Sequence, residues 1–176
     1  MIKQVFIING SGGVGKDTFI ELMCNQALDK VKIGNYSSID KVKEIAKAIG
    51  WNGEKTERDR KFLSDLKLLT TEYNNMPLND MKEYAKNFMD DETDNKILFL
   101  HIREPEEIEK AVNEFKEYNV KTILVKRDCV KHIVSNMADE NVYNYNYDIV
   151  IENNGTLENL TSMSKQFLND CLTHKV

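Results

Sequence analysis

Residues 10–18, GSGGVGKDT, are the most informative stretch of this 176-residue chain. They follow the apolar run KQVFII at 3–8 and open an amphipathic segment at 16–29, so a strand, a glycine-rich loop and a helix occur in that order. Glycines let successive backbone N–H groups turn toward one anion, because no Cβ blocks its approach, and the helix N-terminus adds partial positive charge. We therefore predict that residues 10–18, here called the phosphate loop, bind the phosphates of a nucleotide.

Lys16, Asp17 and Thr18 carry the chemistry expected of this loop. The spacing from Gly10 to Lys16 fits the G-x-x-x-x-G-K part of a Walker A motif, in which the lysine reaches phosphate oxygens. Asp17 stands where the motif usually has the Ser or Thr that holds Mg²⁺, and a carboxylate can bind Mg²⁺ directly or through water. Thr18 could donate its hydroxyl to the α-phosphate. The alternative, a glycine-rich turn that merely ends in lysine, is disfavoured by the complete strand, loop and helix pattern.

Composition and charge narrow the class of protein. Hydrophobic residues make up 41% and charged residues 30% of the chain, which is ordinary for one globular domain spanning residues 1–176. The net charge of −5 disfavours binding to nucleic acid polymers, and no apolar stretch has the length of a membrane span. The three cysteines form no C-x-x-C pair and no secretory leader is recognisable, so we expect reduced thiols and a cytoplasmic location. The sequence does not indicate an oligomeric state.

Arginine is rare among the basic residues of the chain. Of 24 lysines and arginines, the arginines are only Arg58, Arg60, Arg103 and Arg127. A guanidinium group binds phosphate through a pair of parallel hydrogen bonds, which an ammonium group cannot do, so sites that need this geometry should keep arginine. The four arginines are therefore candidate phosphate ligands, with retention by chance as the alternative for each.

Five short apolar segments are expected to form a parallel sheet. They are residues 3–8, 31–36, 97–102, 122–125 and 148–151, and each is followed by a loop or a helical pattern. The segments 3–8 and 97–102 are continuous apolar runs, typical of strands buried on both faces, so they should be central neighbours. The alternation of strands and helices predicts a three-layer α/β fold.

The chain between the second and third strands has about 60 residues, which is too long for an ordinary crossover, so we predict a helical insertion at about residues 52–94. A helix expected at 54–73 has four apolar residues at helical spacing on its inner side, namely Phe62, Leu66, Leu69 and Tyr73. Arg58 should point to the same inner side, whereas Arg60 lies on a flank. We expect this insertion to cover an acceptor, so Arg58 and Arg60 are candidate acceptor ligands.

Ser37 and Ser38 follow the second strand and are expected to cap the next helix. Because they lie at the carboxyl end of that strand, they are also candidate contacts of an acceptor, together with Lys41. A serine cap beside a solvated lysine is the competing interpretation, and the sequence does not decide between the two.

Arg103 leaves the carboxyl end of the segment 97–102, the edge at which ligands of open α/β sheets bind. No aspartate ends this strand, so the usual second magnesium carboxylate is missing, and His101 is expected to be an ordinary packed histidine. Residues 127–147 are polar and rich in Asn and Tyr, which predicts a lid-like segment over the phosphates, with a plain surface excursion as the alternative. Arg127, at its start, is expected near the nucleotide.

The overall pattern resembles the nucleoside monophosphate kinase branch of the P-loop proteins. The GKDT ending at 15–18 and the stretch DIVIENNGTLE at 148–158 are most similar to deoxynucleoside monophosphate kinases of the phage type, and more distantly to animal-type phosphomevalonate kinases. The resemblance implies the strand order 2-3-1-4-5, with ATP and Mg²⁺ as cofactors. Together with the candidates argued above from the residues, it gives three groups of site residues. The nucleotide site would comprise Gly10, Gly12, Gly13, Val14, Gly15, Lys16, Asp17, Thr18 and Arg127. The acceptor site would comprise Ser37, Ser38, Arg58, Arg60 and Arg103, and the catalytic residues would be Lys16, Asp17 and Arg103.

These observations favour ATP-dependent phosphoryl transfer to a small phosphorylated acceptor, with a nucleoside or deoxynucleoside monophosphate as the first choice. Such transfer needs positioning and charge neutralisation more than a covalent group, so a phosphate loop, Mg²⁺ and two or three arginines suffice. A kinase of a non-nucleotide phosphorylated metabolite and a non-catalytic nucleotide-binding or switch protein are the alternatives. The helical insertion favours an acceptor site over a switch.

Overall fold

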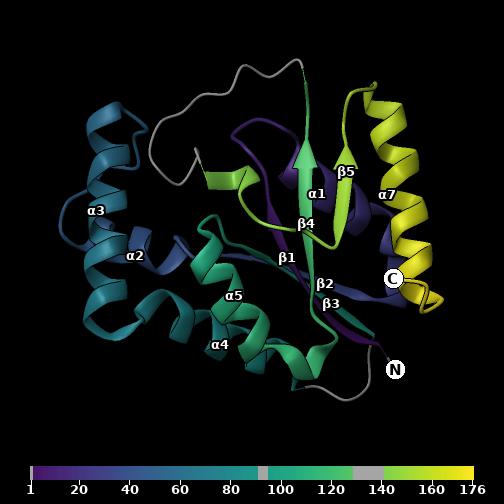
Figure 1. The fold of residues 1–176 in the computed structure, drawn as a ribbon, viewed down its shortest axis with the longest axis horizontal. Helices are drawn as coiled ribbons and strands as arrows, with labels where there is room; N and C mark the ends of the chain where they lie inside the picture. Colours follow the sequence, from purple (N-terminus) through teal and green to yellow (C-terminus); the bar gives the residue numbers. More distant parts are fainter. Residues whose placement is uncertain (1, 91–94, 129–140) are drawn as a thin grey trace.

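The computed structural model describes residues 2–90, 95–128 and 141–176, which contain a five-stranded parallel sheet with helices on both faces (Figure 1). Its strands are β1 (Lys3–Asn9), β2 (Lys32–Ser37), β3 (Lys96–His101), β4 (Lys121–Lys126) and β5 (Ile149–Glu152). The strand order is β2-β3-β1-β4-β5, and every pairing is parallel. The prediction of an α/β fold with the order 2-3-1-4-5, and with β1 and β3 as central neighbours, is confirmed.

Two helical layers cover this sheet. The helices are α1 (Lys16–Ala27), α2 (Asp40–Ala48), α3 (Glu57–Asn74), α4 (Met76–Met89), α5 (Pro105–Glu114) and α7 (Leu157–Leu172). Short 3₁₀ turns occupy Leu28–Lys30, Lys116–Tyr118 and Asn141–Tyr143. α1 and α7 pack on one face of the sheet, and α4 and α5 pack on the other (Figure 1). In the described part of the chain, no helix combines the length and apolarity that crossing a membrane requires.

β1 is buried on both faces because its apolar run has no polar interruption. Val5 and Ile7 belong to the core beneath α4 and α5, whereas Phe6 and Ile8 belong to the core beneath α1 and α7, and all four are fully buried. The Phe6 ring stacks on Phe99 of β3, with ring centroids 5.4 Å apart. The phosphate loop therefore starts from a strand that is central in the sheet and buried on both faces.

α3 and α4 follow α2 in the chain between β2 and β3, and α3 projects beyond the sheet (Figure 1). A capping box between Thr56 and Asp59 starts α3. The prediction that Leu69 and Tyr73 face inward is wrong, since these residues are 63% and 85% exposed. Phe62 and Leu66, at the start of the same apolar stripe, are half-buried, so only its C-terminal part is left in solvent, which periodicity alone cannot reveal.

Candidate active site

The phosphate loop can take its shape only with glycine at two of its positions. Gly10 has φ +146°, and a Cβ there would lie 2.5 Å from the carbonyl oxygen of Val125, which is backbone and cannot move aside. Gly15 has φ +98°, and a Cβ there would lie 2.5 Å from Asn153 Nδ2. Residues with a side chain are strained at these φ values, and the two contacts leave no room for a Cβ. Glycine at both positions therefore lets the loop backbone curve around an anion.

Two buried asparagines hold the loop, and neither was among the predicted site residues. Asn9 ends β1, and its Oδ1 accepts a hydrogen bond from the Gly10 N–H at 2.8 Å. Asn153 follows β5, and its Nδ2 donates to the carbonyl oxygen of Val14 at 2.9 Å. Each of these asparagines lies at the carboxyl end of an apolar strand, and this pattern could have indicated their role. A buried amide without a hydrogen-bond partner destabilises the fold, so a buried asparagine at this place is expected to bond to nearby backbone.

Lys16 lies back along the phosphate loop. Its Nζ donates to the carbonyl oxygens of Gly10 and Ser11, at 2.5 and 3.0 Å. The ammonium group is thereby placed beside the backbone that would surround a phosphate chain, and both contacts are of the kind that a phosphate oxygen can replace.

The phosphate loop opens into a cleft of about 500 Å³, whose walls come from the loop, the β2–α2 junction, α3 and the β3–α5 junction. Six basic residues line this cleft: Lys16, Lys43, Lys55, Arg60, Lys67 and Arg103. Its acidic lining residues are Asp17, Asp40 and Glu104. The lining is therefore net positive in a chain of net charge −5, and this concentration of positive charge favours anionic ligands.

Eight of the predicted site residues lie together in this lining. They are Gly12, Gly13, Lys16, Asp17, Ser37, Ser38, Arg60 and Arg103. Gly10, Val14 and Gly15 shape the loop instead, and Val14 is buried in the core. Thr18 and Arg58 are exposed outside the cleft lining.

Arg127 and the described residues of the predicted lid-like segment are not among the residues that line the cleft. The Nε of Arg127 is buried without a hydrogen-bond partner in the described part of the chain. Of the predicted lid-like segment 127–147, residues 129–140 lie outside the described residues. Its described end reaches β1, because the Tyr147 hydroxyl accepts from Asn9 Nδ2 at 2.7 Å.

The expectation that Arg58 faces inward and Arg60 lies on the flank is reversed in the structure. Arg60 lines the cleft together with Leu63, Ser64 and Lys67, at the spacing i, i+3, i+4, i+7 of one helix face. The sequence interpretation took the apolar stripe as the inner one. α3 instead turns a mostly polar face inward because that face borders a cleft rather than a core.

The serine caps are also corrected. α2 begins at Asp40 with Ile39 as its N-cap, so neither Ser37 nor Ser38 caps it. The Ser37 N–H donates to Asp40 Oδ2 at 2.9 Å, and the Ser38 N–H donates to the carbonyl oxygen of His101 at 3.1 Å. The Ser38 bond holds the turn against β3, the Ser37 bond ties it to the start of α2, and both serines line the cleft.

Lys41, the third candidate from this turn, points elsewhere. It pairs with Glu44 at 2.9 Å on the exposed side of α2 and does not line the cleft. Lys43 instead occupies the position expected of Lys41. Lys43 lines the cleft and pairs with Asp40 at 3.2 Å.

His101 is packed, as expected, but it is packed into the site. Its side chain is 15% exposed, its Nε2 lies 2.7 Å from Asn35 Oδ1, and the same nitrogen lies 3.7 Å from Asp17 Oδ1. Burial lowers the pKa of His101 to about 4, against an opposing contribution from the negative charge of Asp17. The imidazole is therefore neutral at neutral pH.

The low pKa of His101 predicts a specific pH dependence of stability. An unfolded histidine takes up its proton near pH 6.5 and the folded one only near pH 4, so the unfolded state binds more protons between these values. The free energy of unfolding should therefore fall as the pH drops from 6.5 toward 4, and His101→Gln should flatten that fall. Urea unfolding at a series of pH values measures it. An unchanged slope in the variant would show that His101 does not titrate in this way.

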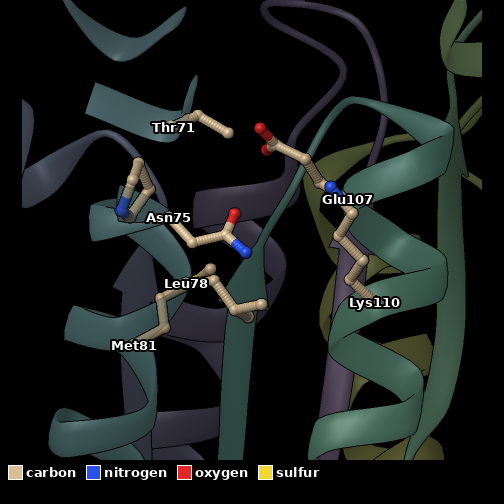
Figure 2. A pocket seen from close by; sticks show the side chains of 7 residues that line it. Thr71, Asn75, Leu78, Met81, Glu107 and Lys110 are labelled. Atoms are coloured by element: carbon tan, nitrogen blue, oxygen red, sulfur yellow. The ribbon is translucent and has the colours of Figure 1, made fainter. Parts of the chain in front are cut away.

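A second cavity lies between the insertion and α5, where Leu78 and Asn75 face Glu107 and Lys110 (Figure 2). Its volume is about 10 Å³, room for about one water molecule. It cannot hold a substrate, so the cleft is the candidate site among the described residues.

Comparison with known proteins bears on the fold. No family model matches the sequence, and no curated protein matches it. Solved structures do match over nearly the whole chain. An APS kinase from Mycobacterium tuberculosis shares 13% identity, with 98% of each chain covered and a TM-score of 0.53. A shikimate kinase from Acinetobacter baumannii, solved with shikimate, shares 10% identity over 100% of this chain and 96% of that chain, with a TM-score of 0.54.

A sugar kinase from Janibacter sp. is a third example, with 12% identity, 96% of this chain and 95% of that chain covered, and a TM-score of 0.51. The chain has the P-loop kinase fold. At these identities the likeness establishes the architecture, and the chemistry has to be argued from the cleft itself.

Proposed function

We propose that the cleft transfers the γ-phosphoryl group of ATP to a small phosphorylated acceptor, with a nucleoside or deoxynucleoside monophosphate as the preferred class. The observation that carries this proposal is that one cleft joins the phosphate loop to two arginines from other elements, Arg60 of α3 and Arg103 after β3. A protein that only binds a nucleotide needs the loop but not this second set of phosphate ligands.

Each residue has a role in the transfer. Lys16 neutralises charge on the donor phosphates as the transferred group moves, and the loop N–H groups orient them. Arg103 and Arg60 hold the acceptor phosphate so that its oxygen meets the γ-phosphorus in line. No separate general base is required, because the attacking oxygen belongs to a phosphate that is already ionised at neutral pH.

Support for a base-bearing acceptor comes from Tyr36. Its ring lines the cleft and stacks on Tyr84, with centroids 4.1 Å apart and planes 14° apart. Its hydroxyl donates to Asp80 Oδ2 at 2.5 Å, and burial together with this bond raises its pKa. A neutral, fixed aromatic ring gives a nucleobase a surface to contact. The structural neighbours named as kinases of small molecules support phosphoryl transfer in general, and the resemblance at 15–18 and 148–158 supports the nucleotide acceptor.

The residues present fit Mg²⁺. In the described residues no three of His, Cys, Asp and Glu gather to hold a metal ion, but Mg²⁺ in phosphate sites needs only one or two carboxylates besides water and phosphate oxygens. Asp17 lies on the first turn of α1, and its side chain is 85% exposed toward the cleft. Bound there, Mg²⁺ would neutralise the negative charge of the transferring phosphates.

Asp17→Asn is therefore expected to raise the magnesium concentration needed for half-maximal turnover by about tenfold, while the fold is retained. The measurement is a magnesium titration of the initial rate at fixed ATP, with circular dichroism as the check on folding. An unchanged magnesium requirement would mean that the carboxylate only complements the helix N-terminus, an effect of about 0.3–1 kcal/mol.

A thermal-shift screen tests the proposed function without knowledge of the acceptor. A non-hydrolysable ATP analogue with Mg²⁺ should raise Tm, and one or more nucleoside monophosphates should raise it further. A monophosphate present at one hundred times its Kd adds about 2.7 kcal/mol to the free energy of unfolding. A response to phosphorylated metabolites but not to nucleotides favours the metabolite kinase. A response to the ATP analogue that no acceptor changes favours a binding or switch protein.

A further inference from the structure

Lys67 is the only buried residue of α3, whose positions are all described. This helix has 18 residues, and its exposed positions include Leu68, Leu69 and Tyr73. The side chain of Lys67 is only 10% exposed. A helix that leaves large apolar residues in solvent and buries a lysine is attached to the domain at this point by charge.

The partners of Lys67 lie at the start of α5. Its Nζ donates to Glu104 Oε2 at 2.6 Å and to Glu107 Oε2 at 2.7 Å. Glu104 is the N-cap of α5, and Glu107 lies in its first turn. Lys67 thus joins the insertion to the element that directly follows β3.

Arg103 sits between two fixed points at this junction. On one side its carbonyl oxygen accepts from Asn9 Nδ2 of β1 at 3.0 Å. On the other side the next residue, Glu104, is held by Lys67. Arg103, Glu104 and Lys67 all line the cleft, so the charge contact and the candidate acceptor ligand border the same space.

Stability alone does not explain this arrangement. Burying a lysine and partly burying two carboxylates is costly, and apolar residues of similar size commonly hold two elements together as well. Ion pairs differ from apolar contacts in their geometry, because each short charged hydrogen bond fixes the positions of both side chains.

We propose that Lys67 is a positioning residue which, through Glu104 and Glu107, orients Arg103 in the cleft and couples that orientation to α3. The meaning of this orientation for an acceptor phosphate rests on the proposed function. The physical claim concerns only the mobility of the Arg103 side chain.

The rarity of arginine makes the claim directly measurable. Protein labelled with ¹⁵N at arginine has four side-chain Nε signals, from Arg58, Arg60, Arg103 and Arg127. The Arg103 signal is the one missing from Arg103→Lys. In Lys67→Met its heteronuclear NOE should fall to about half the wild-type value, as expected when an ordered group becomes flexible.

Two variants serve as controls for this experiment. Lys67→Arg keeps the charge and should preserve the Arg103 signal. Lys61→Met removes another lysine of α3, which pairs with Asp65 at 2.7 Å in solvent, and should leave the Arg103 signal unchanged. An Arg103 signal unaffected by Lys67→Met overturns the proposal.

A triple variant separates positioning from stability, and it decides the matter if Lys67→Met alone does not fold. Lys67→Met combined with Glu104→Gln and Glu107→Gln leaves no unpaired buried charge, so its Tm should recover toward the wild-type value. The Arg103 side chain should nevertheless stay mobile. If Arg103 becomes ordered again together with Tm, the role of Lys67 is purely structural and the proposal fails. The spectra need no substrate, so the result of this test does not depend on whether any monophosphate is phosphorylated.

Discussion

Replacing Lys16 with alanine is expected to lower kcat/KM for phosphoryl transfer by at least about 100-fold while leaving the fold intact. The Lys16 ammonium donates to loop carbonyl groups and is not part of the core, so its loss should not unfold the domain. Its Nζ lies against the loop backbone, so its loss should leave the transferring phosphate without this positive charge. A coupled assay of ADP release, beside circular dichroism, measures both effects.

Lys165→Ala is a suitable control for that experiment. Lys165 is exposed on α7, the helix that packs with α1 beneath the phosphate loop, and its loss should change neither turnover nor folding. Unchanged turnover in a folded Lys16→Ala variant would exclude the phosphate loop as the catalytic centre.

Arg103→Lys should lower kcat/KM for the acceptor at least about tenfold, or about 1.4 kcal/mol, with the affinity for an ATP analogue unchanged. A lysine keeps the charge but loses the paired hydrogen bonds of the guanidinium group, so the acceptor phosphate would be held less accurately. Steady-state kinetics with varied acceptor, together with calorimetric titration of the ATP analogue, separate the two effects.

The insertion supplies a matched pair of arginines for the same test. Arg60 lines the cleft, whereas Arg58, two residues earlier on α3, is exposed outside it. Arg60→Lys should therefore reproduce part of the acceptor defect, and Arg58→Lys should behave like the wild type. Equal behaviour of the two variants would contradict the helix register that brings Arg60, and not Arg58, to the cleft.

The sheet and the phosphate loop could be predicted from the sequence because both depend on local patterns. The continuous apolar run of β1 specifies burial on both faces, and the glycine spacing before Lys16 specifies the loop. The order of the strands followed from the resemblance at 15–18 and 148–158, and the structure confirms it.

The acceptor side of the cleft was predicted less well, for a physical reason. Periodicity identifies the apolar stripe of a helix but cannot say whether another element covers it, and α3 leaves Leu69 and Tyr73 exposed. Its inner face borders a cleft, so Arg60 and Lys67 lie inward. The contacts of His101 with Asn35 and of Lys67 with Glu104 join residues that are 66 and 37 positions apart, and only the tertiary structure brings them together.

The most direct test follows the phosphoryl group itself. ATP labelled with radioactive phosphorus at the γ position is incubated with the protein, Mg²⁺ and a panel of nucleoside and deoxynucleoside monophosphates, and the products are separated by chromatography. We expect the label to appear in a nucleoside diphosphate, and to depend on Lys16 and Arg103. Label that stays in ATP, or that appears only in inorganic phosphate with every monophosphate, would contradict phosphoryl transfer to this class of acceptor.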